Sequence, residues 1–190
     1  MRAGISLLLL LLAAPAGAQT GTDQASARLP VCLACHGQTG TSSTENVPSL
    51  GAMPVNYVLT QLYLFREKLR VAEPMNAMAA GLTDDDLRSL ADTFNKMPAP
   101  TPAAALAPAE REAGQALLGK YHCNSCHGPD LAGQSTIPRT AGQREDYVRK
   151  ALIAYKTNVR KGYSPAMNEA SQDIKDDEIP LLARYVASFR

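Results

Sequence analysis

The chain has 190 residues, of which 19 are basic and 18 are acidic, so its formal net charge at neutral pH is only +1. This near balance gives no reason to expect a nucleic-acid partner, and the length allows two small domains. Aromatic residues make up only 5% of the sequence and tryptophan is absent. Domains of about 80 residues with so few large side chains have thin cores and usually need a covalent link or a cofactor to be stable.

Residues 1–18 have the pattern of a secretory signal peptide. Arg2 supplies the positive charge, residues 5–12 form an apolar run, and residues 16–18 form an A-x-A cleavage site. The apolar run is too short for a mature membrane span, although an uncleaved anchor is the alternative. Cleavage would make Gln19 the N-terminus, and we therefore expect a periplasmic protein.

The motif C-x-x-C-H occurs twice and uses all four cysteines. It is the attachment signature of a c-type haem, because two thiols at this spacing can add to two vinyl groups of the porphyrin and the following imidazole can ligate the iron. Attachment of this kind takes place outside the bacterial cytoplasm, in agreement with export. Two covalently bound haem c groups are predicted, with attachment at Cys32, Cys35, Cys123 and Cys126 and iron ligation by His36 and His127.

Two other uses of paired cysteines are less consistent with the sequence. Zinc ribbons space their pairs by about 15–20 residues, whereas Cys35 and Cys123 are 88 positions apart. A redox C-x-x-C motif would need a βαβ context, and no strand pattern surrounds either motif. The third histidine, His122, is expected to be a surface residue rather than a ligand.

The two motifs belong to an internal repeat. Aligning them brings Pro48 opposite Pro138 and Tyr57 opposite Tyr147, both at an offset of 90. After each tyrosine, apolar residues follow at spacings of 4, 3 and 4, which is one face of an α-helix. The predicted faces comprise Val58, Leu62, Phe65 and Leu69 in repeat 1, and Val148, Leu152, Tyr155 and Val159 in repeat 2.

A second amphipathic helix closes each repeat. In repeat 1, Thr83 followed by Asp86 resembles a capping box, so we expect the helix to begin there. In repeat 2, Pro180 lies inside the matching segment, and proline is tolerated in the first helical turn. The sequence therefore predicts a later start in repeat 2, with Asp176 or Asp177 as the N-cap.

The repeats are separated by a proline-rich, uncharged stretch at residues 98–108, which we expect to be a partly extended linker. The predicted domains are therefore residues 19–97 and 109–190. Repeat 2 opens with a clear helix at about 110–120, whereas the corresponding segment of repeat 1, residues 23–29, is only weakly apolar.

The second iron ligand can be methionine, histidine or absent, and methionine is typical of electron-transfer cytochromes. Met167 is the single methionine of repeat 2 and lies seven residues before Ile174. In repeat 1, only Met75 has the same relation to its following helix, seven residues before Leu82. We therefore predict Met75 and Met167 as iron ligands. The remaining methionines of repeat 1, expected to be core filler, are Met53, Met78 and Met97.

Taken together, the doubled C-x-x-C-H-G, the proline segments and the methionine loops resemble the tandem di-haem class I cytochromes c of the cytochrome c4 family, over essentially the whole mature chain. This resemblance implies an all-α fold of two tandem class I cytochrome c domains, each wrapping one covalent haem. It also implies that the carbonyls of Pro48 and Pro138 accept the N–H of the ligating histidines.

In members of this family the N-terminal helix crosses the C-terminal helix, and a glycine of the first contacts an aromatic residue of the second. Repeat 2 has Gly114 and Tyr185 at these positions, whereas repeat 1 has Asp23 and Thr93. Repeats 1 and 2 carry net charges of −2 and +2, and residues 139–161 contain a basic stretch that could form a docking rim.

The resemblance implies a periplasmic electron carrier and not an enzyme. The implied donors are a quinol-oxidising cytochrome bc complex or a periplasmic dehydrogenase, and the implied acceptor is a terminal oxidase or a similar reductase. Loose membrane association and the oligomeric state are left open.

The alternatives are a di-haem redox enzyme and a fixed cytochrome subunit of a dehydrogenase complex. A peroxidase needs an iron with an open position, and methionine on both irons argues against it. Sulfur-compound oxidases often use a cysteine ligand, and no cysteine is left over.

Overall fold

The structure is a computed structural model that describes residues 22–161 and 165–190, and within these ranges it is helical with no β-strand. The predicted signal peptide lies outside the described residues. Domain 1 comprises the helices α1 (Thr22–His36), α2 (Val55–Arg66), α3 (Met75–Ala79) and α4 (Asp84–Lys96). Domain 2 comprises α5 (Pro108–Lys120), α6 (Cys123–His127), α7 (Glu145–Lys156), α8 (Ala166–Gln172) and α9 (Ile179–Ser188). The predicted all-α fold is confirmed.

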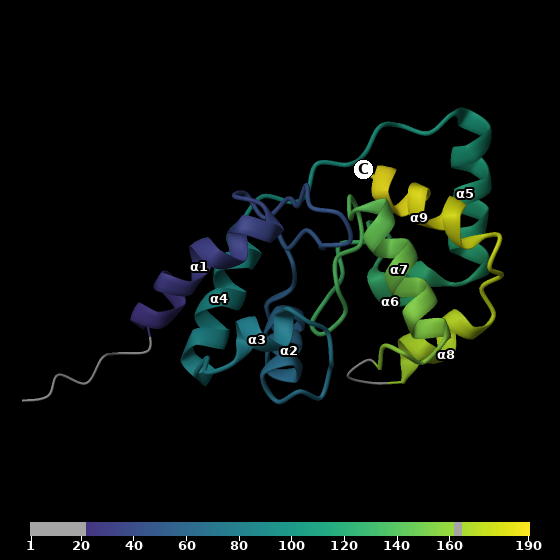
Figure 1. The fold of residues 1–190 in the computed structure, drawn as a ribbon. Coiled ribbons are helices and arrows are strands. Elements are labelled where there is room, and N and C mark those ends of the chain that lie inside the picture. Colours follow the sequence, from purple (N-terminus) through teal and green to yellow (C-terminus); the bar gives the residue numbers. More distant parts are fainter. Residues whose placement is uncertain (1–21, 162–164) are drawn as a thin grey trace, which may run out of the picture.

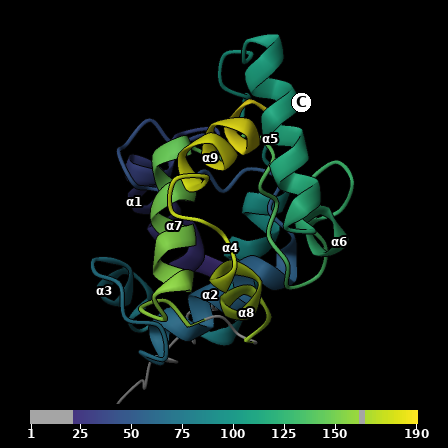
Figure 2. The ribbon, with the colours of Figure 1, turned by 90° about the vertical axis from the view of Figure 1, so that its right-hand side faces the viewer.

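Each domain has its own hydrophobic core, and the two domains lie side by side (Figure 1). The linker joins the end of α4 to the start of α5. In domain 1, α2 packs on α4, and in domain 2 the corresponding helix α7 packs on α9. Figure 2 shows that α9 is also covered by α5. The linker is attached to domain 2, because the Ala103 N–H donates to the Ala187 carbonyl over 2.8 Å. None of the described helices is both long and apolar enough to cross a bilayer.

The predicted apolar face of α2 is confirmed except at its last position. That of α7 is confirmed at Val148 and Leu152, whereas Tyr155 is only half-buried. Leu69 and Val159 lie beyond the helix ends and are 63% and 83% exposed. Both helices stop early because Lys68 and Asn158 adopt left-handed backbone angles, with φ of 55° and 57°. Such a residue closes a helix C-terminus, but glycine usually occupies this position, so the sequence carried no clear stop signal.

The two closing helices begin differently. In α4 the predicted capping box is present: the Thr83 N–H donates to Asp86 Oδ2 over 2.8 Å, and the Asp86 N–H donates to Thr83 Oγ1 over 3.1 Å. In α9 the predicted N-cap is wrong, since Glu178 rather than Asp176 or Asp177 precedes the first helical residue. A turn in which the Glu178 N–H donates to the carbonyl of residue 175 delays the helix.

The N-terminal helices differ between the domains. In domain 2, α5 crosses α9 at Gly114, where an added Cβ would lie 2.6 Å from Tyr185 atoms, so the predicted glycine–aromatic crossing is confirmed. In domain 1, α1 packs on α4 without this pair and places Ala25 in the core. Helix α1 also continues through Pro30 to the end of the cysteine motif, whereas His122 separates α5 from α6 with a φ of 51°. The side chain of His122 is exposed, as predicted.

Candidate haem-binding sites

Each C-x-x-C-H motif ends a helix with its histidine turned toward the protein interior. In domain 1, His36 is only 6% exposed and its Nδ1 lies 2.8 Å from the Pro48 carbonyl oxygen. In domain 2, the Nδ1 of His127 lies 2.9 Å from the Pro138 carbonyl oxygen. A carbonyl can only accept, so Nδ1 carries the proton and Nε2 keeps a lone pair for a metal. The expected proline–histidine contacts are therefore present in both domains.

The surroundings of these histidines favour the neutral imidazole. Burial lowers the pKa of His36 and of His127, and the hydrogen bond to the proline carbonyl opposes this only in part. Burial likewise raises the pKa of the Cys32 and Cys123 thiols. The second cysteine of each motif is exposed. Neutral imidazole is the form that ligates metal ions.

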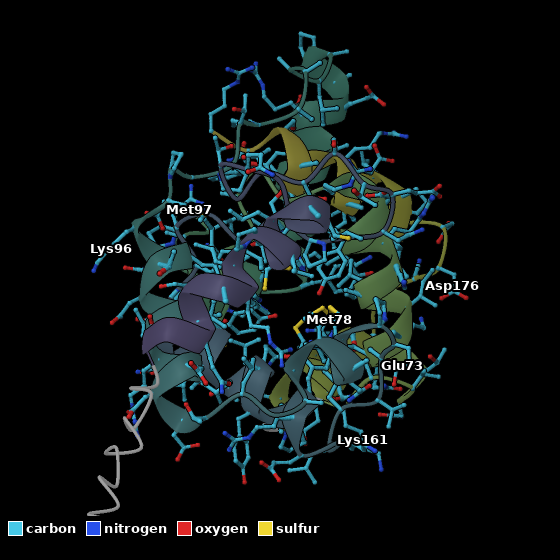
Figure 3. All side chains as sticks on the ribbon, turned by 60° about the vertical axis from the view of Figure 1, so that its left-hand side comes forward. Glu73, Met78, Lys96, Met97, Lys161 and Asp176 are labelled. Atoms are coloured by element: carbon cyan, nitrogen blue, oxygen red, sulfur yellow. The ribbon has the colours of Figure 1, made fainter. Side chains whose placement is uncertain are left out.

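The two predicted methionine ligands lie in matching places. Met75 begins α3 and packs partly buried against the domain 1 core, and Met167 lies in α8 and packs against the domain 2 core. Met78, labelled in Figure 3, is 39% exposed on the same short helix as Met75. Met53 is fully buried in the core, which agrees with its expected role as filler. Met78 is too exposed for that role.

Sequence reasoning missed the residue that follows each of these methionines. The Asn76 side chain is 4% exposed, and its Nδ2 donates to the carbonyls of Phe65 and Arg70, both over 2.8 Å. Its Oδ1 accepts the Ala72 N–H at 2.7 Å. Asn76 therefore ties the start of α3 to the end of α2 and fixes the loop that carries Met75.

Domain 2 repeats this arrangement around Asn168. Its Nδ2 donates to the carbonyls of Tyr155 at 3.0 Å and Arg160 at 2.8 Å, which are the repeat partners of Phe65 and Arg70. The shared contacts support the alignment of Met75 with Met167. The signal that could have revealed these residues is the dipeptide Met-Asn, which occurs in both methionine loops.

A second group that sequence reasoning missed lies between the domains. Arg160 is 9% exposed, and its Nη1 and Nη2 donate to the hydroxyls of Tyr147 at 3.0 Å and Tyr57 at 3.2 Å, so it joins the two domains. Arg160 therefore does not belong to an exposed basic rim, contrary to the sequence-based expectation. Burial raises the pKa of Tyr147, but the nearby Arg160 and Arg70 guanidinium groups outweigh this effect and lower it to about 8.

These two arginines have no carboxylate partner among the described side chains. Arg160 Nε is buried without a hydrogen-bond partner in the part of the chain that the structure describes, and the guanidinium lies 4.5 Å from the centre of the Tyr155 ring. Arg70 stacks on the Phe65 ring at 4.6 Å and donates to Gln61. A buried charge without a counter-ion is costly, and a haem carries two carboxylates. Together with the neutral imidazoles, thioethers and paired thiols, these residues fit a pair of haems.

Known proteins resemble this chain over most of its length. The cytochrome c family model matches residues 111–190. A cytochrome c4 of Thiocapsa roseopersicina is 34% identical over 167 residues, covering 82% of this chain and 85% of the relative. A thiosulfate dehydrogenase electron acceptor of Stutzerimonas stutzeri is 30% identical over 204 residues, covering 98% and 93%. The crystal structure of reduced cytochrome c4 from Pseudomonas stutzeri superposes with a TM-score of 0.79 at 26% identity, covering 88% of this chain and 98% of that one.

The fold and the repeated site define a class of protein: a di-haem electron-transfer cytochrome c with two tandem class I domains. Its cofactors are two covalently bound haem c groups. At this identity and coverage, the chain belongs to the cytochrome c4 family.

Proposed function

We propose that this protein carries single electrons in the periplasm between a dehydrogenase or quinol-oxidising complex and a terminal oxidase or reductase. The observation that carries the proposal is the repeated geometry of the two motifs. In each domain a neutral histidine is held at Nδ1 by a proline carbonyl, and a methionine loop is fixed by an asparagine at the equivalent place.

The side chains of each domain divide the work of holding one haem. In domain 1 the attachment residues are Cys32 and Cys35, and the iron ligands are His36 and Met75. In domain 2 the corresponding residues are Cys123, Cys126, His127 and Met167. The haem supplies a reversible one-electron change at iron, and a methionine ligand raises its potential. The buried Arg160, with Tyr57 and Tyr147, would neutralise and bind haem carboxylates between the domains.

A dehydrogenase is the donor that we favour. One relative that is 30% identical over nearly the whole chain is named a thiosulfate dehydrogenase electron acceptor. A dehydrogenase releases electrons in pairs, and a carrier with two haems can accept one electron at each. Periplasmic placement would require export directed by residues 1–18, which would then be removed by cleavage after Ala18.

Denaturing mass spectrometry tests the attachment. The protein from a haem-maturing host should have the mass of residues 19–190 plus two haems. The variant Cys32→Ala with Cys35→Ala should keep one haem, whereas the control Ala34→Ser, which changes an exposed residue inside the same motif, should keep two. A wild-type chain without two haems, or a double variant that still has two, would refute the assignment.

A further inference from the structure

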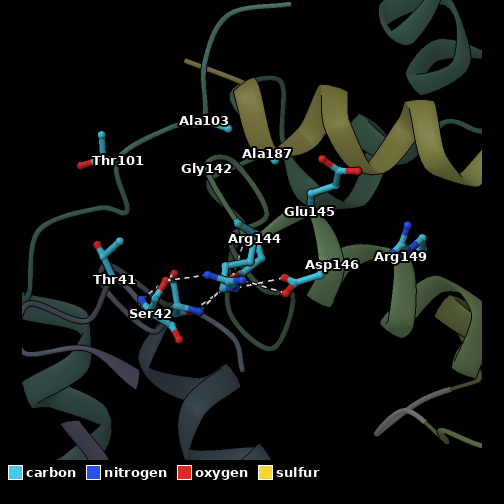
Figure 4. Close-up of a pocket in the computed structure, with 12 residues that line it drawn as sticks. Thr41, Ser42, Thr101, Ala103, Gly142, Arg144, Glu145, Asp146, Arg149 and Ala187 are labelled. Carbon is cyan, nitrogen blue, oxygen red and sulfur yellow. Dashed lines mark hydrogen bonds and ion pairs between the residues drawn. The ribbon is translucent and has the colours of Figure 1, made fainter. Parts of the chain in front are cut away.

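Domain 2 holds a segment of domain 1 that contains the predicted histidine support. Four interdomain hydrogen bonds end on backbone groups of residues 42–49. Arg144 donates to the Ser42 carbonyl at 3.3 Å, and Asp146 Oδ2 accepts the Asn46 N–H at 2.9 Å. Figure 4 shows Arg144 reaching toward Ser42 and paired with Asp146. The other two hydrogen bonds join Gln143 to Ser49.

The contact between Gln143 and Ser49 is buried and two-sided. Ser49 N–H donates to Gln143 Oε1 at 2.8 Å, and Gln143 Nε2 donates to the Ser49 carbonyl at 2.9 Å. Gln143 is 4% exposed and Ser49 is 1% exposed. The carboxamide of Gln143 thus satisfies both backbone groups of Ser49, in the way that a paired β-strand satisfies the N–H and C=O of its neighbour.

One peptide group connects this contact to the haem ligand. The Ser49 N–H belongs to the same peptide as the Pro48 carbonyl, which accepts the His36 Nδ1–H at 2.8 Å. The chain of hydrogen bonds therefore runs from the imidazole through a single peptide to the carboxamide of Gln143. An acceptor on a peptide N–H polarises the group and makes its oxygen a stronger acceptor.

Among the described residues of domain 2 there is no equivalent of this relay. The Pro138 carbonyl accepts from His127, but among the hydrogen bonds of the described residues none has the Arg139 N–H as its donor. In the repeat alignment, Met53 occupies the position of Gln143. A thioether is only a weak acceptor, and Met53 lies buried in the core of its own domain.

We propose that Gln143 is a positioning residue for His36 and that its hydrogen bond, through the Pro48–Ser49 peptide, lowers the reduction potential of the domain 1 haem. A histidine that donates a stronger hydrogen bond from Nδ1 gives more electron density to iron, which favours the oxidised state. The docking of domain 2 therefore helps to make the two haems unequal. This inference rests on the proposed function, in which His36 is an iron ligand.

The test is a redox titration of the complete di-haem protein with Gln143→Met, which installs the residue that repeat 1 has at this position. An open surface pocket of about 440 Å³ adjoins Gln143. The reduction potential of the domain 1 haem should rise by ~28 mV, which for a one-electron couple is about a threefold change in the equilibrium constant in favour of the reduced state. The reduction potential of the domain 2 haem should not change. In the reduced protein, the NMR signal of the His36 Nδ1 proton should indicate a weaker hydrogen bond, with His127 unaffected.

The control is Arg144→Gln, which removes another interdomain contact but leaves the Pro48–Ser49 peptide paired. It also removes a positive charge, which would lower the potentials, so its effect has the opposite sign. A rise in the Arg144 variant equal to that in Gln143→Met would show that loosening of the domains is the cause and would overturn the proposal. An unchanged domain 1 potential, or equal rises at both haems, would also overturn it.

A second variant covers the case in which Gln143→Met does not fold. Gln143→Asn keeps the amide but withdraws it by one methylene, and it should shift the domain 1 potential in the same direction. If neither potential moves in this variant although NMR shows the Ser49 contact broken, the proposal is wrong. A wild-type protein that lacks haem in domain 1 would instead refute the proposed function, and mass spectrometry detects that result before any titration.

Discussion

The crossing of α5 over α9 gives a prediction whose size follows from the structure. A methyl group at Gly114 would lie 2.6 Å from the Cβ and Cδ2 of Tyr185 and 2.7 Å from its Cγ. Carbon atoms at their best separation are about 3.5–4.0 Å apart, so the two helices would have to separate by roughly 1 Å. Tyr185 is buried and cannot swing away into solvent.

We expect Gly114→Ala to destabilise domain 2. Overpacking a tight contact costs about 1–3 kcal/mol, and the gain in helix propensity returns about 0.5–1 kcal/mol. The net loss should be about 1 kcal/mol, within a range of about 0–2.5 kcal/mol. A loss of 1 kcal/mol lowers the melting temperature of a domain of this size by about 4–8 °C. The melting temperature of domain 2 can be measured by following the long-wavelength methionine–iron absorption band of its haem during thermal unfolding.

The same helix supplies a matched control. Gly119 also lies in α5, but beyond its chain neighbours and the nearby backbone of its own helix, an added Cβ would meet no atom of the described residues within 4 Å. Gly119→Ala should therefore be neutral or stabilising by about 0.4–1 kcal/mol. If the two variants unfold at the same temperature, the close approach of α5 to Tyr185 does not limit the stability of domain 2, and the reasoning is refuted.

Three further predictions concern ligation, pH and docking. Met75→Ala should abolish half of the methionine–iron band, whereas Met78→Ala, at an exposed position on the same helix, should leave it whole; the reverse would show that the repeat alignment slips by three residues. Hydrogen bonds from Arg144 lower the pKa of Asp146 from 3.8 to about 2, although burial opposes the shift. Because this pKa falls on folding, Asp146→Asn should reduce the free energy of unfolding above pH 4, and the reduction should shrink as the pH falls from 4 through 2; urea unfolding at several pH values checks this. Stopped-flow electron transfer should slow with ionic strength if domain 2 docks through its exposed basic residues, and Lys150→Glu with Lys161→Glu should slow it further at low salt, whereas a flat response would indicate an apolar docking surface.

Much of the site was predictable because its chemistry is encoded locally or by the repeat. The positions of Cys32 and His36 follow from a five-residue motif, and Met75 was selected only because repeat 2 contains a single candidate at the same distance from its helix. The start of α4 at Thr83 was predictable for the same reason, since a capping box lies within four residues.

The features that were missed depend on residues brought together across long sequence distances. Gln143 contacts Ser49 across 94 positions, and Arg160 contacts Tyr57 across 103. In sequence, Arg160 looks like one charge in a basic run, and only the docking of the domains buries it. The early end of α2 was missed because Lys68 is not a residue that usually takes left-handed backbone angles.

The asparagine that follows each methionine has a consequence for the speed of electron exchange. Asn76 pairs with three backbone groups at 2.7–2.8 Å, so the polypeptide next to Met75 is held by the protein and does not depend on the metal for its shape. In the proposed site, where Met75 ligates the iron, a loop that is rigid in advance moves little when the iron changes its charge. The reorganisation energy of the couple is then small, and thermal fluctuations more readily bring donor and acceptor to equal energy.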